Sequence, residues 1–306
     1  MTATSDWRPT HDDPLFILAM DHRGSFGKTL FDVEDDKPTD AQATAMRAAK
    51  DTIFRGLLLA SKQLSQGRAG VLVDEQYGNA VIESASSQPV VLAVPVEASG
   101  HDWFTLEWGD MWREHVTRIQ PAYAKVLVRD NPNFDAAQRR AQLSRLAEVS
   151  AGLAELGLPL LYELLVPATD SQLAQVGADQ DRYDRELRPD LVCRVIADNQ
   201  NKGIEPTLWK VEGLDTVEAA RQVAEQVGAN GRDALLIVLG RDAPAERLDH
   251  WLQIASSVER FVGFAIGRSI WEDVIRQHGT DGDDAAAAGQ IADRYLGFTR
   301  QWAASG

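Results

Sequence analysis

Residues 123–166, YAKVLVRDNPNFDAAQRRAQLSRLAEVSAGLAELGLPLLYELLV, contain the pattern that decides the fold. A short apolar run at Tyr123–Val128 is followed by a long amphipathic stretch, Phe134–Leu156, which ends at Gly157. A second apolar run, Leu158–Val166, comes next. Short runs rich in Val, Ile and Leu are typical of strands that are covered on both faces. The stretch therefore predicts a strand, a helix and a second strand parallel to the first.

The same alternation continues in both directions along the chain. Six further apolar runs predict strands: Leu15–Met20, Gly70–Asp74, Val90–Val96, Leu208–Val211, Ala234–Gly240 and Phe261–Ile266. Amphipathic stretches predict helices at Thr39–Gln66, Pro189–Asn201, Thr216–Val227, Ala245–Val258, Arg268–Gln277 and Asp284–Ala303, and a weaker one at Asn79–Ser86. Eight strand-then-helix units predict an α/β fold, the (β/α)8 TIM barrel. We expect residues 1–306 to form one such domain, with a short N-terminal extension and an extra C-terminal helix.

A doubly wound open sheet is the alternative arrangement of alternating strands and helices. That fold predicts a GxGxxG turn after the first strand, and residues 21–25 read DHRGS instead. A Walker GxxxxGK[ST] motif is also missing from the sequence. The barrel is therefore the favoured fold.

Charge and composition narrow the classes of partner. The 306 residues include 31 Lys and Arg against 46 Asp and Glu, a net charge of −15 without a basic block. This balance argues against a protein that binds nucleic acid or an anionic membrane. The N-terminus is polar, and no apolar stretch approaches the roughly 18 residues that cross a bilayer. We expect a cytoplasmic protein whose partner is a small molecule. A homo-oligomer is a possible assembly of the chain.

Metal ligands are sparse in the sequence. The single cysteine, Cys193, excludes an internal disulfide and a cysteine-rich metal site. The six histidines form neither an HExxH motif nor a close pair, whereas a catalytic zinc site needs about three ligands. We therefore expect no metal and no cofactor.

Three consecutive predicted strands each carry a charged residue inside an apolar run: Lys125, Glu163 and Lys210. A buried isolated charge costs several kcal/mol, so such residues rarely remain unpaired. Because helices cover the outside of a parallel barrel, these three side chains can meet in its mouth. One interpretation is an ion-pair network that only fixes the strands. The other is a Schiff-base site, in which burial and a neighbouring cation favour a neutral, nucleophilic lysine and the carboxylate moves protons.

The last two predicted strands both end in a Gly-Arg pair, Gly240-Arg241 and Gly267-Arg268. The loops after strands seven and eight of such barrels often bind phosphate, because glycine lets backbone N–H groups approach the anion. The arginines can add charge-assisted hydrogen bonds. Turn glycines followed by solvated arginines are the alternative interpretation.

Other candidate substrate-binding residues follow the first three strands. Asp21 can bind a hydroxyl group and Arg23 an anionic group, both just past the first strand. His22, between them, is either a substrate ligand or a hydrogen-bonded structural residue. Asp74 and Glu97 lie at a similar depth after the next two strands, where a helix cap or a solvated side chain is the alternative to a substrate ligand.

Several blocks of the sequence together resemble a known family. RPDLVCRVIADNQNKGIEPTLWKVEGLD, YELLVPAT and GFAIGRSIW resemble a domain of the DUF2090 type, known as 2-deoxy-5-keto-D-gluconate-6-phosphate aldolase. That domain is often fused behind a sugar kinase in inositol catabolism. MDHRGSF, VLVDEQYG, YAKVLV and YELLV are more distantly similar to class I tagatose-1,6-bisphosphate aldolase and its sulfosugar-phosphate relatives. The resemblance extends from about residue 14 to residue 275.

The resemblance implies a class I aldolase on a (β/α)8 barrel that cleaves a ketose phosphate. By match to the family's motifs, Lys210 would form the Schiff base, with the family's glutamate at Glu163 and its other lysine at Lys125. The phosphate site would lie at the two Gly-Arg pairs. For 2-deoxy-5-keto-D-gluconate 6-phosphate the products would be dihydroxyacetone phosphate and malonate semialdehyde. A tagatose-bisphosphate or sulfofructose-phosphate aldolase and a non-catalytic sugar-phosphate-binding regulator are the alternatives.

Overall fold

Eight parallel strands close into a barrel in the computed structural model, which describes residues 7–241, 243–278 and 284–304. Each strand pairs with its neighbours in chain order, and β8 pairs with β1. The strands are β1 Leu15–Ala19, β2 Arg68–Leu72, β3 Val91–Pro95, β4 Tyr123–Arg129, β5 Leu160–Leu165, β6 Leu208–Glu212, β7 Leu235–Leu239 and β8 Phe261–Ile266. This confirms the predicted (β/α)8 barrel. Residues 1–6 of the predicted N-terminal extension lie outside the described part.

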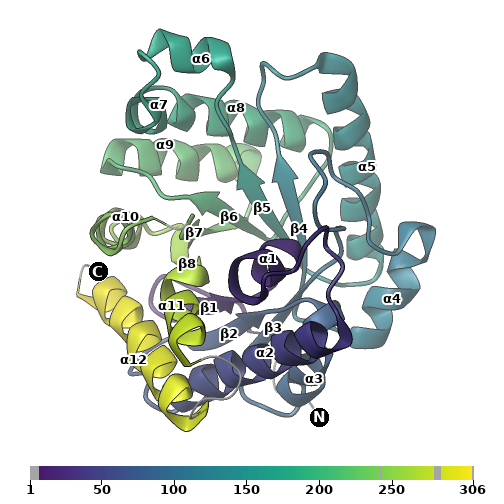
Figure 1. The fold of residues 1–306 in the computed structure, drawn as a ribbon. Helices are drawn as coiled ribbons and strands as arrows, with labels where there is room; N and C mark the ends of the chain where they lie inside the picture. Colours follow the sequence, from purple (N-terminus) through teal and green to yellow (C-terminus); the bar gives the residue numbers. More distant parts are fainter. Residues whose placement is uncertain (1–6, 242, 279–283, 305–306) are drawn as a thin grey trace.

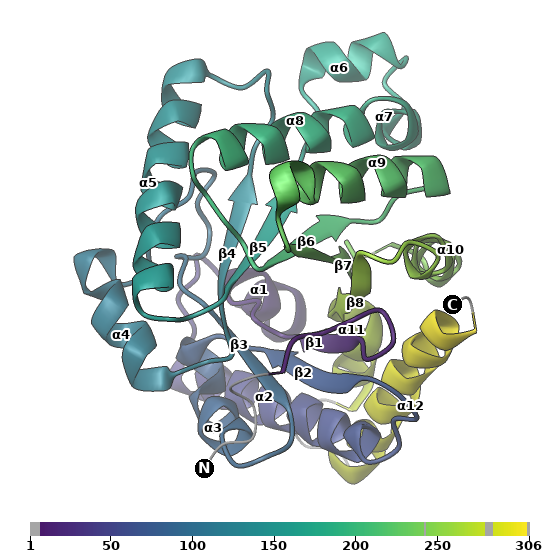
Figure 2. The same ribbon diagram turned by 180° about the vertical axis from the view of Figure 1, so that it is seen from behind.

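Helices surround the barrel on all sides (Figures 1 and 2). They are α1 Gly24–Phe31, α2 Asp40–Ser61, α3 Glu75–Ala85, α4 Trp112–Ile119, α5 Ala136–Glu155, α6 Asp170–Gln175, α7 Gln180–Glu186, α8 Arg188–Asn201, α9 Val217–Val227, α10 Ala245–Ser256, α11 Arg268–His278 and α12 Asp284–Ala303, with 3-10 turns η1 Gly109–Met111 and η2 Ala229–Gly231. The sequence patterns missed α1, α4, α6 and α7, because helices of one or two turns show little periodicity. None of the described helices is long and apolar enough to cross a lipid bilayer.

Alternation along the strands divides the core into two layers. On β1, Leu15 and Ile17 point into the barrel, whereas Phe16 and Leu18 pack against the surrounding helices. Burial of such a side chain contributes about 1.5–3 kcal/mol, and residues of both layers are almost completely buried. The inner layer consists of Leu15, Ile17, Ala19, Leu72, Val91, Ala93, Tyr123, Leu161, Leu208, Ile237, Val262 and Ala265.

The last two helices close the barrel against its first strand. α12 packs against α2, as both ribbon views show (Figures 1 and 2). Gly56 permits this approach, since a Cβ atom there would lie 2.6 Å from the Ile291 side chain. The Tyr295 hydroxyl of α12 donates to the Phe16 carbonyl at 2.6 Å, and the Trp271 indole of α11 donates to the Ala19 carbonyl at 2.9 Å. Strand β1 is therefore fixed by its neighbours β2 and β8 and by both helices.

Candidate active site

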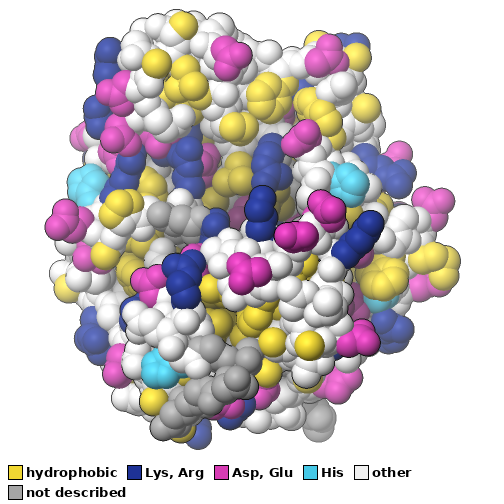
Figure 3. All heavy atoms as spheres, viewed as in Figure 1, with side chains coloured by type: hydrophobic (Ala, Val, Ile, Leu, Met, Phe, Trp, Pro, Cys, Tyr) yellow, Lys and Arg dark blue, Asp and Glu magenta, His cyan; other side chains and the backbone are white. Residues whose placement is uncertain are grey.

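A cavity of about 370 Å³ opens where the strands end at their carboxyl edges. Lys and Arg side chains lie around the hollow in the centre of this face (Figure 3). The cavity brings together all but one of the site residues expected from the sequence: Asp21, His22, Arg23, Glu97, Lys125, Glu163, Lys210, Gly240, Arg241, Gly267 and Arg268.

The strand register explains why three charged side chains point into this cavity. Residues two apart on a strand share a face, so a charge that follows an inner-layer residue by two positions also points inward. The inner-layer residue and the charge that follows it are Tyr123 and Lys125 on β4, Leu161 and Glu163 on β5, and Leu208 and Lys210 on β6. Glu163 and Lys210 are direct partners in the β5–β6 register. The charged residues therefore form the layer directly above the apolar interior.

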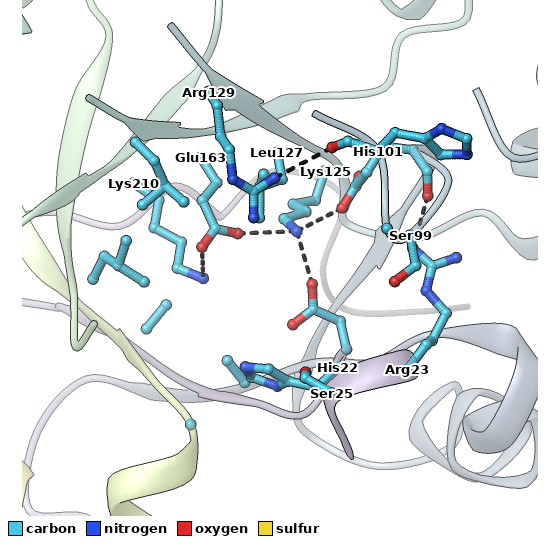
Figure 4. Close-up of a pocket in the computed structure, with 18 of the residues that line it drawn as sticks. His22, Arg23, Ser25, Ser99, His101, Lys125, Leu127, Arg129, Glu163 and Lys210 are labelled. Atoms are coloured by element: carbon cyan, nitrogen blue, oxygen red, sulfur yellow. Dashed lines mark hydrogen bonds and ion pairs between the residues drawn. The ribbon is translucent and has the colours of Figure 1, made fainter. Parts of the chain in front are cut away.

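Glu163 links the two lysines. Its Oε1 atom lies 2.8 Å from Lys210 Nζ, and its Oε2 atom lies 2.9 Å from Lys125 Nζ (Figure 4). All three side chains are buried, with Lys125 1% exposed. Burial alone would raise the pKa of Glu163, but the ammonium groups of Lys125 and Lys210 outweigh burial and lower it. Glu163 is therefore an ionised carboxylate held between two cations.

Lys125 binds three carboxylates and Lys210 binds one. Besides Glu163, Lys125 Nζ contacts Asp21 Oδ2 at 2.8 Å and Glu97 Oε1 at 2.7 Å. Burial lowers the pKa of Lys125, but these three carboxylates prevail and raise it well above its ordinary value. Within the described residues, Glu163 is the sole carboxylate paired with Lys210. Lys125 therefore stays protonated, and the two lysines differ in the number of carboxylates that they contact.

The remaining groups near the lysines differ in charge. Burial opposes ionisation of Asp21, but Lys125 and Lys210 lower its pKa. Burial raises the pKa of Glu97, whose Oε2 atom has no hydrogen-bond partner among the described residues. Burial also lowers the pKa of His22 to about 4, so its imidazole is neutral at pH 7. The cavity thus offers a fixed carboxylate and a neutral ring as hydrogen-bonding groups.

The expectation that Asp74 binds substrate is wrong. Its side chain is fully buried, does not line the cavity and forms an ion pair with Lys50 of α2. Asp74 also caps α3, accepting a hydrogen bond from the Tyr77 N–H at 2.9 Å. Lys50 Nζ donates to the carbonyls of Met20 at 2.8 Å and His22 at 3.0 Å, on either side of Asp21. The pair therefore fixes the loop after β1 instead of contacting a ligand.

Arg23 lines the cavity but is engaged in holding the loop after β3. Its guanidinium donates to the Glu97 carbonyl at 2.8 Å and to Glu107 Oε2 at 3.0 Å. This guanidinium therefore has two protein partners, which compete with an anionic ligand.

Backbone and guanidinium groups meet at the ends of β7 and β8. Gly267 directly precedes α11, whose first N–H groups lack helical partners and favour an anion. A Cβ atom at Gly267 would lie 2.5 Å from the Ala19 carbonyl, so only glycine fits there. Arg241 lies beside this turn, with Nε 3.0 Å from Glu212 and NH1 3.0 Å from Asp184. These two carboxylates fix its guanidinium at the cavity wall.

Asp184 and Glu212 also bind a second arginine, Arg188. Arg188 begins the sequence block RPD, and Glu212 belongs to the block KVEG. Arg188 is fully buried behind Arg241, with Nε 3.1 Å from Asp184 Oδ1 and NH1 3.8 Å from Glu212 Oε2. The sequence patterns did not indicate this support for Arg241. Glu212 gave a usable signal, since it follows Lys210 by two positions on the same strand face.

Arg129 is a further cavity residue that the sequence analysis missed. It follows Lys125 by four positions, which keeps it on the inward face of β4, but it lies just beyond the predicted strand end. Among the described residues, no group of three or more His, Cys, Asp or Glu side chains has the arrangement of a metal site.

Comparison with known proteins gives a family and a fold. The family described as "Uncharacterized protein conserved in bacteria (DUF2090)" matches residues 3–306. Among solved structures, the chain is similar to the crystal structure of Cgl0159 from Corynebacterium glutamicum (Brevibacterium flavum), with 17% identity and a TM-score of 0.56. That alignment covers 93% of this chain and 86% of the other, and at this identity it supports the fold alone. The search of curated proteins found no match.

Proposed function

The chain belongs to the DUF2090 family, and we propose that it is a class I aldolase in which Lys210 forms a Schiff base with a ketose phosphate. One observation carries the proposal: a single buried carboxylate, Glu163, binds both Lys210 and a second lysine that is held protonated by three carboxylates. A Schiff-base enzyme needs a lysine that can lose its proton next to a group that accepts it. Glu163 and Lys210 meet that need in this site.

The two lysines take different roles. Lys125 keeps its proton because Asp21, Glu97 and Glu163 surround it, so it cannot attack a carbonyl. Its ammonium group instead orients the three carboxylates, Glu163 among them. Lys210 transfers a proton to Glu163 at 2.8 Å and attacks the ketone as a neutral amine.

The resemblance of the sequence blocks favours 2-deoxy-5-keto-D-gluconate 6-phosphate as the substrate. Lys210 adds to the C5 ketone to give a carbinolamine. Glu163 returns its proton to the departing hydroxyl group, so water leaves, an iminium ion forms and Glu163 is again a carboxylate. Removal of the C3 hydroxyl proton by Glu163 breaks the C3–C4 bond, and the bonding electrons pass into the iminium as an enamine. Malonate semialdehyde leaves with C1 to C3. Protonation at C4 and hydrolysis by water then release dihydroxyacetone phosphate and restore Lys210.

The phosphate of this substrate would bind where β7 and β8 end. Gly267 and the first turn of α11 present backbone N–H groups, and Arg241 adds a positive charge that Asp184 and Glu212 hold at the cavity wall. Asp21 and His22, at the end of β1, would bind hydroxyl groups of the sugar chain. Because Arg241 is already held in place, its side chain would lose less conformational entropy when phosphate binds.

Borohydride trapping tests the proposal directly. The protein is incubated with dihydroxyacetone phosphate, reduced with borohydride, and analysed by intact mass and peptide mapping. We expect one adduct, on Lys210. The Lys210→Ala variant should lose the adduct and the turnover while it keeps its circular dichroism spectrum. Lys202→Ala, which removes an exposed lysine at the end of α8, should form the same adduct on Lys210 as the wild type.

The outcomes separate the alternatives. An adduct on Lys125 would reverse the roles of the two lysines, and retained turnover in Lys210→Ala would refute the mechanism. Coupled detection of dihydroxyacetone phosphate with tagatose 1,6-bisphosphate and a sulfofructose phosphate as further substrates identifies the sugar. Binding of these sugar phosphates without an adduct or turnover would indicate a regulator.

A further inference from the structure

Arg129 extends the line of side chains that β4 presents to the cavity. Lys125, Leu127 and Arg129 occupy alternate positions on this strand, and all three line the cavity. In Figure 4 the Arg129 side chain turns from the end of β4 toward Glu163 and Lys125. The guanidinium group therefore faces the space in which the substrate would lie.

Arg129 lacks the carboxylate partners that hold other arginines of the cavity. No ion pair among the described residues includes it, and its guanidinium makes one hydrogen bond there, a long one of 3.4 Å to the His101 carbonyl. Arg23, in contrast, pairs with Glu107. The adjacent carboxylate, Asp130, is buried and pairs with Arg139 at 2.6 Å. Among the described residues, therefore, no carboxylate neutralises the charge of Arg129 at the edge of the cavity.

The backbone of Arg129 is held in place. Gln142, a buried residue of α5, donates through Nε2 to the Arg129 carbonyl at 3.1 Å. Its Oε1 atom accepts a hydrogen bond from the Phe104 N–H at 2.8 Å, which ties the loop after β3 to the end of β4. A cation that starts from a fixed strand end loses less conformational freedom when it binds an anion.

We propose that Arg129 binds a carboxylate at the end of the substrate that is remote from the phosphate. In the closed barrel β4 and β8 are opposite each other, four strands apart in either direction. Gly267 and α11 follow β8, so the expected phosphate site and Arg129 lie on opposite sides of the cavity. Lys210, on β6, lies between them. A planar guanidinium matches a carboxylate with two parallel hydrogen bonds.

This inference rests on the proposed aldolase function and specifies its substrate class. The ketose phosphate would be an acid, and the aldehyde released from its far end would carry a carboxylate. Arg129 would then determine specificity for the aldehyde without a role in forming the Schiff base.

The synthesis direction separates these two properties. Rates of condensation of dihydroxyacetone phosphate are measured with malonate semialdehyde and with propanal, which has the same three carbons and no charge. For Arg129→Gln we expect kcat/KM to fall about 10- to 100-fold with malonate semialdehyde and less than threefold with propanal. Arg129→Lys keeps the charge and should recover part of the loss. Arg140→Gln, an exposed arginine of α5 away from the cavity, is the matched control.

Trapping of dihydroxyacetone phosphate on Lys210 reports on the proposed function alone and should be unchanged in Arg129→Gln. Suppose that the wild type forms the adduct with dihydroxyacetone phosphate. If Arg129→Gln then loses activity equally with both aldehydes, or loses no activity with either, Arg129 does not bind the carboxylate and the aldolase proposal stands. If the wild type gives no adduct and no condensation, both proposals fail.

Discussion

Replacement of Lys125 with methionine would remove the ammonium group that Asp21, Glu97 and Glu163 all contact. The side chain of Lys125 is 1% exposed, and those of its partners are 12%, 9% and 6% exposed, so solvent screens these interactions little. Methionine is similar in volume and leaves no large cavity. Loss of one partner from a buried ion pair costs about 3–5 kcal/mol, because the other charge is left without compensation. We expect a decrease of about this size in the free energy of unfolding at pH 8.

The decrease should depend on pH in a direction that the structure determines. In the wild type the pKa values of Asp21 and Glu163 are lowered, so both stabilise the fold above their unfolded pKa of about 4. In the variant, only Lys210 still opposes the effect of burial on these two carboxyl groups, so we expect their folded pKa values to rise above the unfolded ones. A raised carboxyl pKa destabilises the fold as pH rises through it. The variant should therefore recover about 1–3 kcal/mol at pH 5 relative to pH 8.

Equilibrium unfolding in urea at pH 5 and pH 8, followed by tryptophan fluorescence, measures this difference. Lys125 itself contributes no pH dependence in this range, since its raised pKa keeps it protonated at both values. Lys202→Met, at an exposed position, should change the stability by less than about 0.5 kcal/mol at either pH. A loss in Lys125→Met that is equal at both pH values, or larger at pH 5, would refute the assigned charges.

Two further predictions concern the phosphate end of the cavity. Arg241→Gln should raise the KM for the phosphorylated substrate about 10- to 100-fold, measured by steady-state kinetics, because a charge-assisted contact is lost. Arg247 also pairs with Asp184, a partner of Arg241, but does not line the cavity, so Arg247→Gln should change KM less than twofold. An equal rise in KM for the two variants would contradict a phosphate-binding role of Arg241. Gly267→Ala should lower the melting temperature, because its Cβ atom would lie 2.5 Å from a backbone carbonyl. Gly240→Ala should leave the melting temperature unchanged, because the nearest atoms to its Cβ atom would be 3.5 Å away. An equal decrease in the melting temperature of both variants would show that the close contact is not the cause.

The sequence could indicate the inward-facing charges because burial and alternation constrain each other on a strand. Once Tyr123–Val128 is recognised as a buried strand, Lys125 must lie on the same face as Tyr123, two residues before it. The same reasoning applies to Glu163 and Lys210 on the following strands. Helices outside the barrel exclude water from the other face, so a charge can reach solvent only through the mouth.

Asp74 shows where this reasoning fails. A carboxylate just past a strand can point into the cavity or cap the next helix, and the sequence does not distinguish the two. Strand β2 ends at Leu72, two residues before the predicted end, because Asp74 is already the cap of α3. Its partner Lys50 is 24 positions earlier on a different helix, a distance at which no local pattern connects them. The pairing of Arg241 with Asp184, 57 positions away, was missed for the same reason.

The contacts that fix β1 also determine when the cavity can form. Trp271 and Tyr295 donate to carbonyls of β1 across 252 and 279 positions of the chain. At about 5–20 residues per second, a ribosome needs roughly 15 to 55 seconds to add the residues that separate Phe16 from Tyr295. During that time the strand that leads to Asp21 lacks its final partners. Strands β4 to β6, which carry both lysines, are synthesised earlier, but β1 gains its last contacts only when α11 and α12 dock. The complete cavity should therefore be the last part of the site to form.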